Sequence, residues 1–194
     1  MHIADGIIAT EICVAADVVS VGALYAFGRR TRPDDIPRMG FLGAALFAVS
    51  LIHFPLAGTS VHLGLIGMAG IMLGIRAFPV MLTTLLFQAL ILQHGGLISL
   101  GINSINMGAG ALLAWGVWHI QRVPVGIRAF AAGFLGIILP AFLMALEFEM
   151  TGYGRGAFFI LSIYAIVAVI EGGLCLSIVN FFQKVKPELL GERQ

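Results

Sequence analysis

The sequence predicts an all-α, polytopic membrane helix bundle. Of its 194 residues, 59% are hydrophobic and only 11% are charged, and the mean hydropathy is +1.01. An ordinary soluble domain carries about 25% charged residues, so the long apolar runs are expected in a bilayer. The net charge of +1 provides no basic field for nucleic acid. We expect one transmembrane domain over residues 1–194, with no second domain and no repeat.

Seven candidate membrane spans follow one another along the chain. Their approximate ranges are 7–27, 39–54, 61–75, 79–93, 105–120, 127–146 and 157–182. Several are shorter than the roughly 20 residues that a straight crossing needs, so tilted, partly buried or re-entrant segments are expected. Small residues, including the pair Gly70 and Gly74, predict close helix packing. Cys13 and Cys175 lie in apolar runs and are interpreted as core residues.

The basic residues predict the orientation of these spans. With the N-terminus outside, ten of the eleven are cytoplasmic and only Arg155 is external. The ten are Arg29, Arg30, Arg32, Arg38, Arg76, Arg122, Arg128, Lys184, Lys186 and Arg193. Because cytoplasmic loops are enriched in Lys and Arg, we expect the N-terminus outside, the C-terminus cytoplasmic and an odd number of spans.

The N-terminal residues do not resemble a secretory signal. Such a signal opens with positive charge, whereas Asp5, Glu11 and Asp17 come here before the first cation, Arg29. His2 is too large for the usual removal of an initiator methionine, so Met1 is expected to be retained.

Four of the five histidines are predicted to meet at the outer end of the bundle. His2, His53, His62 and His94 all fall there, and His119 falls on the cytoplasmic side. A polar outer loop over residues 94–106 is expected to join them. Since imidazole is a good ligand for nickel, cobalt, copper and zinc, the cluster indicates an outward-facing transition-metal site.

A histidine at position two makes the amino terminus a chelator. The terminal amine of Met1, the amide nitrogen of His2 and its ring Nδ1 can bind one ion through a five-membered and a six-membered ring. His62, at the start of a glycine-rich span, is the candidate for the fourth nitrogen. The alternative for His2 is an incidental second residue with no ligand role.

Other polar residues near this end have two interpretations each. Asp5 either orients His2 or is a solvated N-terminal cap. His53, beside Pro55, is favoured as an interfacial or supporting residue rather than a ligand. His94 is either a ligand or a cap at a helix C-terminus.

Three polar residues within or beside the spans also have two interpretations each, one structural and one functional. Asn103 and Asn106 either hold the outer loop through hydrogen bonds to the backbone or line the site. Glu171, the deepest acid, is either a functional carboxylate or a structural hydrogen-bonding group.

The sequence lacks the motifs of several enzyme classes. There is no GxxxxGK[ST], no HExxH and no GxSxG, which argues against a P-loop ATPase, a zincin-type protease and a serine hydrolase. If the predicted metal site serves transport, the protein has to couple to a gradient or use an ATPase on another chain. We therefore predict that the chain is not an enzyme.

Three segments resemble one transporter family. They are Met1-His2-Ile3-x-Asp5-Gly6, then Gly58-Thr59-Ser60-x-His62-Leu63, then Gly95-Gly96-Leu97-x-x-Leu100-Gly101-x-Asn103-x-x-Asn106-Met107-Gly108. In this order they are similar to the substrate-capture subunit (S component, CbiM/NikM type) of energy-coupling-factor cobalt/nickel transporters. The likeness runs from residue 1 to about 110, and hydropathy extends it to the end. Departures are the short C-terminal end and His94, where many relatives carry an acid.

The resemblance implies a function and partners. The substrate would be Co²⁺ or Ni²⁺, bound by the Met1 amine, the His2 amide and ring, and the His62 ring, with no cofactor. Partners would be a transmembrane coupling subunit, two cytoplasmic ATPase subunits and often a small accessory membrane protein, in the cytoplasmic membrane of a prokaryote. The alternatives are a stand-alone secondary metal transporter or channel, an intramembrane enzyme using His62 and Glu171, and a structural membrane subunit without metal.

Overall fold

The protein is a bundle of helices with one small hairpin, described by a computed structural model over residues 2–56, 59–154 and 156–191. The helices are α1 (Thr10–Gly28), α2 (Ile36–Ser50), α3 (Ile66–Leu73), α4 (Ala77–Leu92), α5 (Leu100–Trp118), α6 (Val125–Thr151) and α7 (Ala157–Val185). Short 3-10 turns lie at Pro33–Asp35, Gly74–Arg76 and Pro187–Leu190. The strands are β1 (His53–Leu56) and β2 (Thr59–His62).

The predicted polytopic helix bundle is confirmed, with five stretches long and apolar enough to cross a membrane. Four are the single helices α1, α5, α6 and α7, and the fifth is Ile66–Leu92, which joins α3 to α4. Helix α2 has 15 residues, which is short for a straight crossing. The expected number of seven spans and the expected orientation therefore stay predictions.

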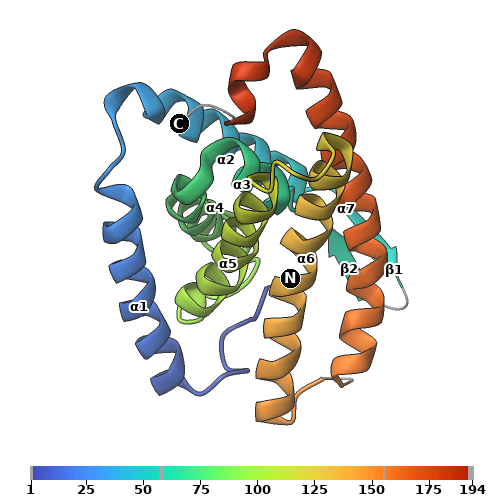
Figure 1. Ribbon diagram of the computed structural model, residues 1–194. Coiled ribbons are helices and arrows are strands. Elements are labelled where there is room, and N and C mark those ends of the chain that lie inside the picture. The colour runs from blue at the N-terminus through green and yellow to red at the C-terminus, as the bar shows by residue number, and fades with distance from the viewer. Residues whose placement is uncertain (1, 57–58, 155, 192–194) are drawn as a thin grey trace.

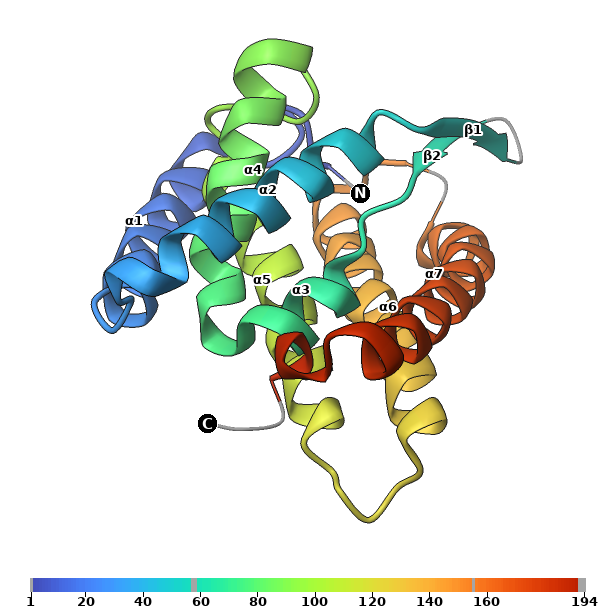
Figure 2. The same cartoon turned by 90° about the horizontal axis from the view of Figure 1, so that it is seen from above.

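Helix α5 lies in the middle of the bundle. It contacts α1, α3, α4 and α6, while α6 and α7 pack along each other (Figure 1). Viewed from above, α2 and the hairpin lie on the side of the molecule where the described N-terminal residues enter (Figure 2). This arrangement brings the start of the chain, the hairpin and the end of α4 into one region.

Close helix packing depends on glycines, as predicted, although not at every one. A Cβ at Gly67 of α3 would lie 2.5 Å from the Cα of Gly133 in α6, and one at Gly70 would overlap the carbonyl oxygen of Ala111 in α5. These helices can therefore approach backbone to backbone. Gly74 has a different role, because it ends α3 with a positive φ of 59°.

The adjoining ends of the predicted spans 39–54 and 61–75 are not helical. Residues 53–56 and 59–62 pair as an antiparallel hairpin, in which His53 lies opposite His62. Pro55 has no N–H for a helix, and Val61 is β-branched, so the extended backbone is favoured here. The outer loop is also shorter than predicted, because α5 begins at Leu100 rather than after residue 106.

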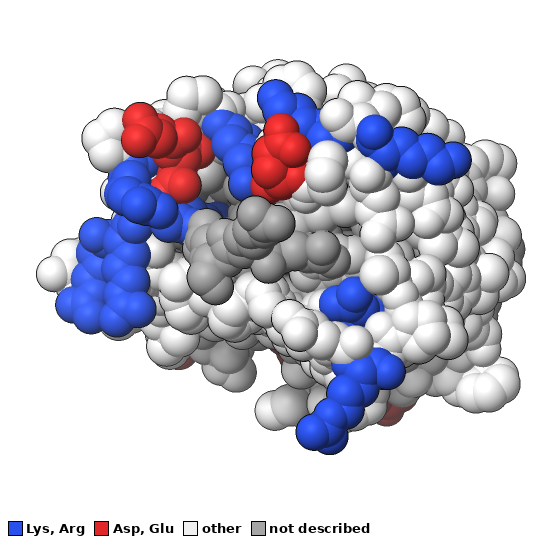
Figure 3. Space-filling model, turned by 45° about the horizontal axis from the view of Figure 1, so that its top comes forward, with Lys and Arg blue, Asp and Glu red and all other residues white. Residues whose placement is uncertain are grey.

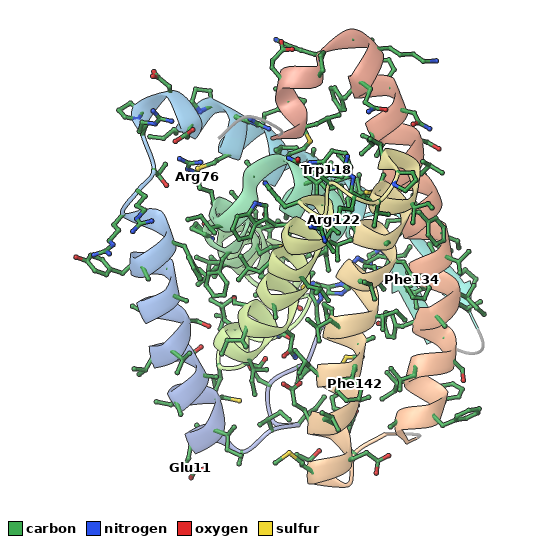
Figure 4. The ribbon with its side chains drawn as sticks, in the orientation of Figure 1. Glu11, Arg76, Trp118, Arg122, Phe134 and Phe142 are labelled. Atoms are coloured by element: carbon green, nitrogen blue, oxygen red, sulfur yellow. The ribbon has the colours of Figure 1, made fainter. Side chains whose placement is uncertain are left out.

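One end of the molecule carries most of the charged side chains in view. In Figure 3, lysines and arginines border this face and the acids form two patches beside them. Arg76 and Asp35 form an ion pair at 3.0 Å. Figure 4 shows Arg76, Trp118 and Arg122 toward this end and Glu11 at the opposite end. Trp118 donates its indole N–H to the Leu190 carbonyl at 2.8 Å, which ties the C-terminal turn to α5.

Candidate metal centre

The N-terminal residues 2–9 precede α1 and form a strap without regular secondary structure. Asn103 of α5 makes two hydrogen bonds to the backbone of Ile3 in the strap. Its Oδ1 accepts the Ile3 N–H at 2.8 Å, and its Nδ2 donates to the Ile3 carbonyl at 2.9 Å. The Ser99 hydroxyl donates to the same carbonyl at 2.7 Å. Ile3 is 1% exposed, so the strap is part of the packed interior and its position is set by these bonds.

Asp5 holds the turn that precedes α5. Its carboxylate accepts the backbone N–H of Leu97 at 3.0 Å and of Ser99 at 2.9 Å, and the Ser99 hydroxyl at 3.1 Å. Burial alone would raise the pKa of Asp5, but the hydrogen bonds from the Ser99, Ile98 and Leu97 amides outweigh it and lower that pKa. Asp5 therefore stays ionised and binds the turn, rather than orienting His2.

Two glycines allow the strap and this turn to approach each other. Gly95 has a φ of +83°, and a Cβ there would lie 3.3 Å from the Cβ of His2. At Gly96 any Cβ would overlap the side chain of Asp5. The Gly-Gly pair therefore has a steric role at the site.

The ring of His2 is held in one tautomer by a hydrogen-bond chain. The Ser50 hydroxyl donates to the Phe47 carbonyl at 2.6 Å, so it accepts from Nε2 of Gln88 at 2.7 Å. The Oε1 of Gln88 then faces Nε2 of His2 at 2.8 Å. Because an amide oxygen only accepts, His2 carries its proton on Nε2 and its lone pair on Nδ1. Nδ1 is the ring atom that the N-terminal chelate requires.

His62 is held in the complementary tautomer. Its Nδ1 lies 2.9 Å from the carbonyl oxygen of Leu63, to which it donates, so Nε2 carries the lone pair. Within the described part of the chain, both Nδ1 of His2 and Nε2 of His62 are buried without a hydrogen-bond partner. Buried polar atoms without a partner are unusual, so these two nitrogens are candidates for binding an ion.

The imidazoles of His2, His62 and His94 form one cluster. A ligand nitrogen from each lies within 4.8 Å of the others. Burial lowers the pKa of His62 to about 3 and of His94 to about 4, and it lowers the pKa of His2 well below the ordinary value. Neighbouring imidazoles lower all three further. The rings are therefore neutral near pH 7, the form in which imidazole binds metals.

The other predicted site residues lie at different places. His53 is exposed and borders the cluster, with its ring 5.3 Å from those of His62 and His94, so the four histidines predicted to meet do lie together. Asn106 instead donates to Glu147 of α6 at 2.8 Å. His119 lies at the other end of α5, about 24 Å from Asn103 at 1.5 Å per residue. Met1 lies outside the described residues.

Glu171 supports the backbone beside the cluster. Its carboxylate accepts N–H groups of Gly64 and Leu65, the latter at 2.9 Å. These residues lie two and three positions after His62, and Leu65 has a left-handed φ of 47°. The structural interpretation of Glu171, rather than a free functional carboxylate, matches these contacts.

Three supporting residues, Gln88, Ser50 and Ser99, were missed by the sequence analysis. Each is at most 4% exposed. A signal was present for Gln88, because a polar residue in an apolar span is expensive and generally functional. No local pattern indicates that it contacts His2, which is 86 residues away.

Comparisons with known proteins identify the family of the chain. A family model described as "Cobalt uptake substrate-specific transmembrane region" (CbiM) matches residues 2–189. A "Putative metal transport protein" of Haemophilus influenzae is 28% identical, over 100% of this chain and 98% of its own length. A "Putative fused nickel transport protein NikMN" of Archaeoglobus fulgidus is 29% identical, over 100% of this chain and 69% of its own.

A solved structure has the same fold. The "Crystal Structure of an Truncated Transition metal Transporter" superposes with a TM-score of 0.83 at 19% identity, covering 95% of this chain and 99% of that one. The family match covers nearly the whole chain, including every residue of the histidine cluster. The chain belongs to the CbiM family of cobalt-uptake transmembrane proteins, a family of metal transport proteins and not of enzymes.

Proposed function

We propose that this protein captures Co²⁺ or Ni²⁺ from outside the cell, as the substrate-specific subunit of an ATP-driven energy-coupling-factor transporter. The ion is its substrate, not a resident cofactor. The observation that carries the proposal is the pair of buried lone pairs on Nδ1 of His2 and Nε2 of His62, both preset by hydrogen bonds and both without a partner among the described residues.

The proposed ligands are four nitrogens. They are the Met1 amine, the His2 amide nitrogen, Nδ1 of His2 and Nε2 of His62. A planar set of nitrogens suits Ni²⁺ and Cu²⁺, and imidazole suits all the late divalent metals. The proposal requires that the mature chain begin at Met1, which the intact mass of the purified protein will test.

The surroundings of the site favour capture over free passage. The cavity beside His62 and Gln88 has a volume of only about 10 Å³ and is lined mainly by apolar residues such as Leu46, Met81 and Met107. An ion bound at the cluster has no open route inward through it. Release on the other side would therefore need a conformational change, and we propose that a partner subunit drives it.

The proposed partners are those that the family resemblance implies. The chain carries no P-loop motif, so ATP hydrolysis would come from two cytoplasmic ATPase subunits acting through a transmembrane coupling subunit. The fused nickel transport relative supports an association with further membrane segments, because its name describes a fusion and it extends beyond the matched region. We propose the cytoplasmic membrane of a prokaryote as the location, with seven spans, the N-terminus outside and the C-terminus inside.

Calorimetry with Ni²⁺ and Co²⁺ tests the site. Full-length protein in detergent, carrying only a C-terminal tag, is expected to bind one ion per chain. A sample acetylated at the Met1 amine is expected to lose that binding, because the blocked amine can no longer complete the His2 chelate rings. Equal binding by both proteins contradicts the N-terminal chelate, and binding by neither contradicts metal capture.

Transport by reconstituted vesicles tests the coupling. The protein alone is expected to move no nickel, and nickel uptake is expected only with the coupling and ATPase subunits and ATP. Gradient-driven uptake by the protein alone would instead identify a stand-alone secondary transporter.

A further inference from the structure

His94 is directed at the cluster by the backbone that follows α4. Gln93 ends that helix in the left-handed region with a φ of 52°, and Gly95 follows with a φ of +83°. The N–H of His94 donates to the Gln88 carbonyl at 3.2 Å. Gln88 therefore positions two histidines, His2 through its side chain and His94 through its backbone.

The three buried or half-buried rings have the geometry of ligands to one ion. Their centroids are 5.0 Å apart for His2 and His62, 4.3 Å for His2 and His94, and 4.9 Å for His62 and His94. With metal–nitrogen bonds of about 2.0–2.1 Å, two imidazoles bound at right angles to one ion have centroids about 4.5 Å apart. The ring planes are also nearly perpendicular in each pair, at 85°, 81° and 85°.

The fused chelate rings proposed above place the imidazole of His2 in the plane of the four nitrogens. The His94 ring stands at 81° to that imidazole, with the centroids 4.3 Å apart, which is the orientation of a ligand above the plane. His53 does not fit the same position. It is outside the set of residues whose ligand atoms lie within 4.8 Å of one another.

We propose that His94 supplies a fifth, apical nitrogen to the captured ion, so that this site is five-coordinate rather than planar. The inference rests on the proposed function and deepens it. Ni²⁺ and Cu²⁺ suit planar nitrogen sets, so a purely planar site would discriminate against Co²⁺. An apical imidazole removes part of this discrimination, and His94 thereby makes cobalt a substrate alongside nickel.

X-ray absorption at the nickel edge counts the imidazoles directly. Full-length Ni²⁺-loaded protein in detergent is expected to show three imidazoles and no pre-edge peak of the planar type. His94→Ala is expected to show two imidazoles and to gain that peak. His119→Ala removes a histidine about 24 Å away along α5 and is expected to leave the spectrum unchanged.

Affinity provides the second measurement. His94→Ala is expected to weaken Co²⁺ binding about tenfold more than Ni²⁺ binding, the lower end of what a lost metal-site group costs. His94→Gln keeps the size of the side chain and replaces imidazole with an amide. The glutamine variant is also expected to show two imidazoles. It provides the test if the alanine variant does not fold.

The outcomes separate this inference from the proposed function. Stoichiometric nickel binding with the same imidazole number in the wild type and both His94 variants overturns the apical ligand and leaves metal capture intact. Loss of one imidazole in His53→Ala, with none lost in the His94 variants, also overturns it. A wild-type protein that binds no nickel overturns both.

Discussion

The helix bundle and the metal centre are held in different ways. Where α3, α6 and α7 meet, the contacts are steric: a Cβ at Gly133 would lie 2.7 Å from the Cβ of Cys175 in α7. At the metal centre the backbone is irregular, and hydrogen bonds to Asp5, Asn103 and Glu171 hold it. Regular helices satisfy their own backbone groups in a membrane, whereas irregular segments need side chains to do so.

This difference predicts separable defects. A change in the bundle alters packing and affects stability and binding together. A change in the hydrogen-bond shell affects the ligand arrangement while the helices stay packed.

Gly133→Leu is expected to have the largest effect. The new side chain would collide with the backbone of α7 at Glu171 and Gly172, so we expect a loss of about 3 kcal/mol or more, the upper range of overpacking. Thermal unfolding in detergent and the yield of folded protein measure this. Gly173→Leu is the matched control, since a Cβ there meets nothing within 4 Å. If both variants melt alike, the steric account of the bundle is wrong.

Gln88→Leu is expected to weaken nickel binding about 10- to 100-fold, the usual effect of losing the partner of a metal-binding histidine. Without the amide oxygen, the proton of His2 is free to move to Nδ1, which removes the ligand lone pair. Gln88→Glu keeps an acceptor oxygen and is expected to recover most of the affinity. Calorimetry measures both, and unfolding temperatures near that of the wild type are expected. Unchanged nickel affinity in the leucine variant would contradict the tautomer argument.

The effect of pH on nickel binding is expected to be the smallest of the three, because the histidine rings of the cluster are already neutral. The pKa of His62 is about 3 and that of His94 about 4, so neither ring takes up a proton between pH 8 and pH 5 in the folded protein. Weaker nickel binding over that range would come from the terminal amine, with an ordinary pKa of about 7.7–8.0, and from the amide. Proton release measured by calorimetry in two buffers is expected to follow the amine and the amide only.

The same pKa values predict the direction of acid destabilisation. An unfolded chain binds a proton at His62 and at His94 below about pH 6.5, whereas in the folded protein these two rings do not until the pKa of about 3 or 4 is reached. Stability is therefore full above about pH 6.5 and falls as the pH decreases toward those values. Ring NMR signals of His62 or His94 in the metal-free protein that titrate near pH 6.5 would contradict this prediction.

Much of the architecture was predictable from the chain alone. Apolar runs with few charges predicted the polytopic helix bundle, because a bilayer accepts little else. The hairpin was not predicted: hydropathy does not distinguish a short apolar strand from the end of a span, and Pro55 was used only to interpret His53. The early end of the outer loop, at Ser99, was missed for a similar reason, since glycine and asparagine suggested a loop where α5 begins.

For the metal centre, the sequence by itself determined which residue types are available and which family the chain resembles, because histidine spacing and the Gly-Gly and Asn signals are local. Only the tertiary structure decided which nitrogens are free. Gln88 meets His2 across 86 residues, and Glu171 meets Leu65 across 106. Such pairs depend on how the helices pack, and packing sums many weak contacts along the whole chain that no local pattern encodes.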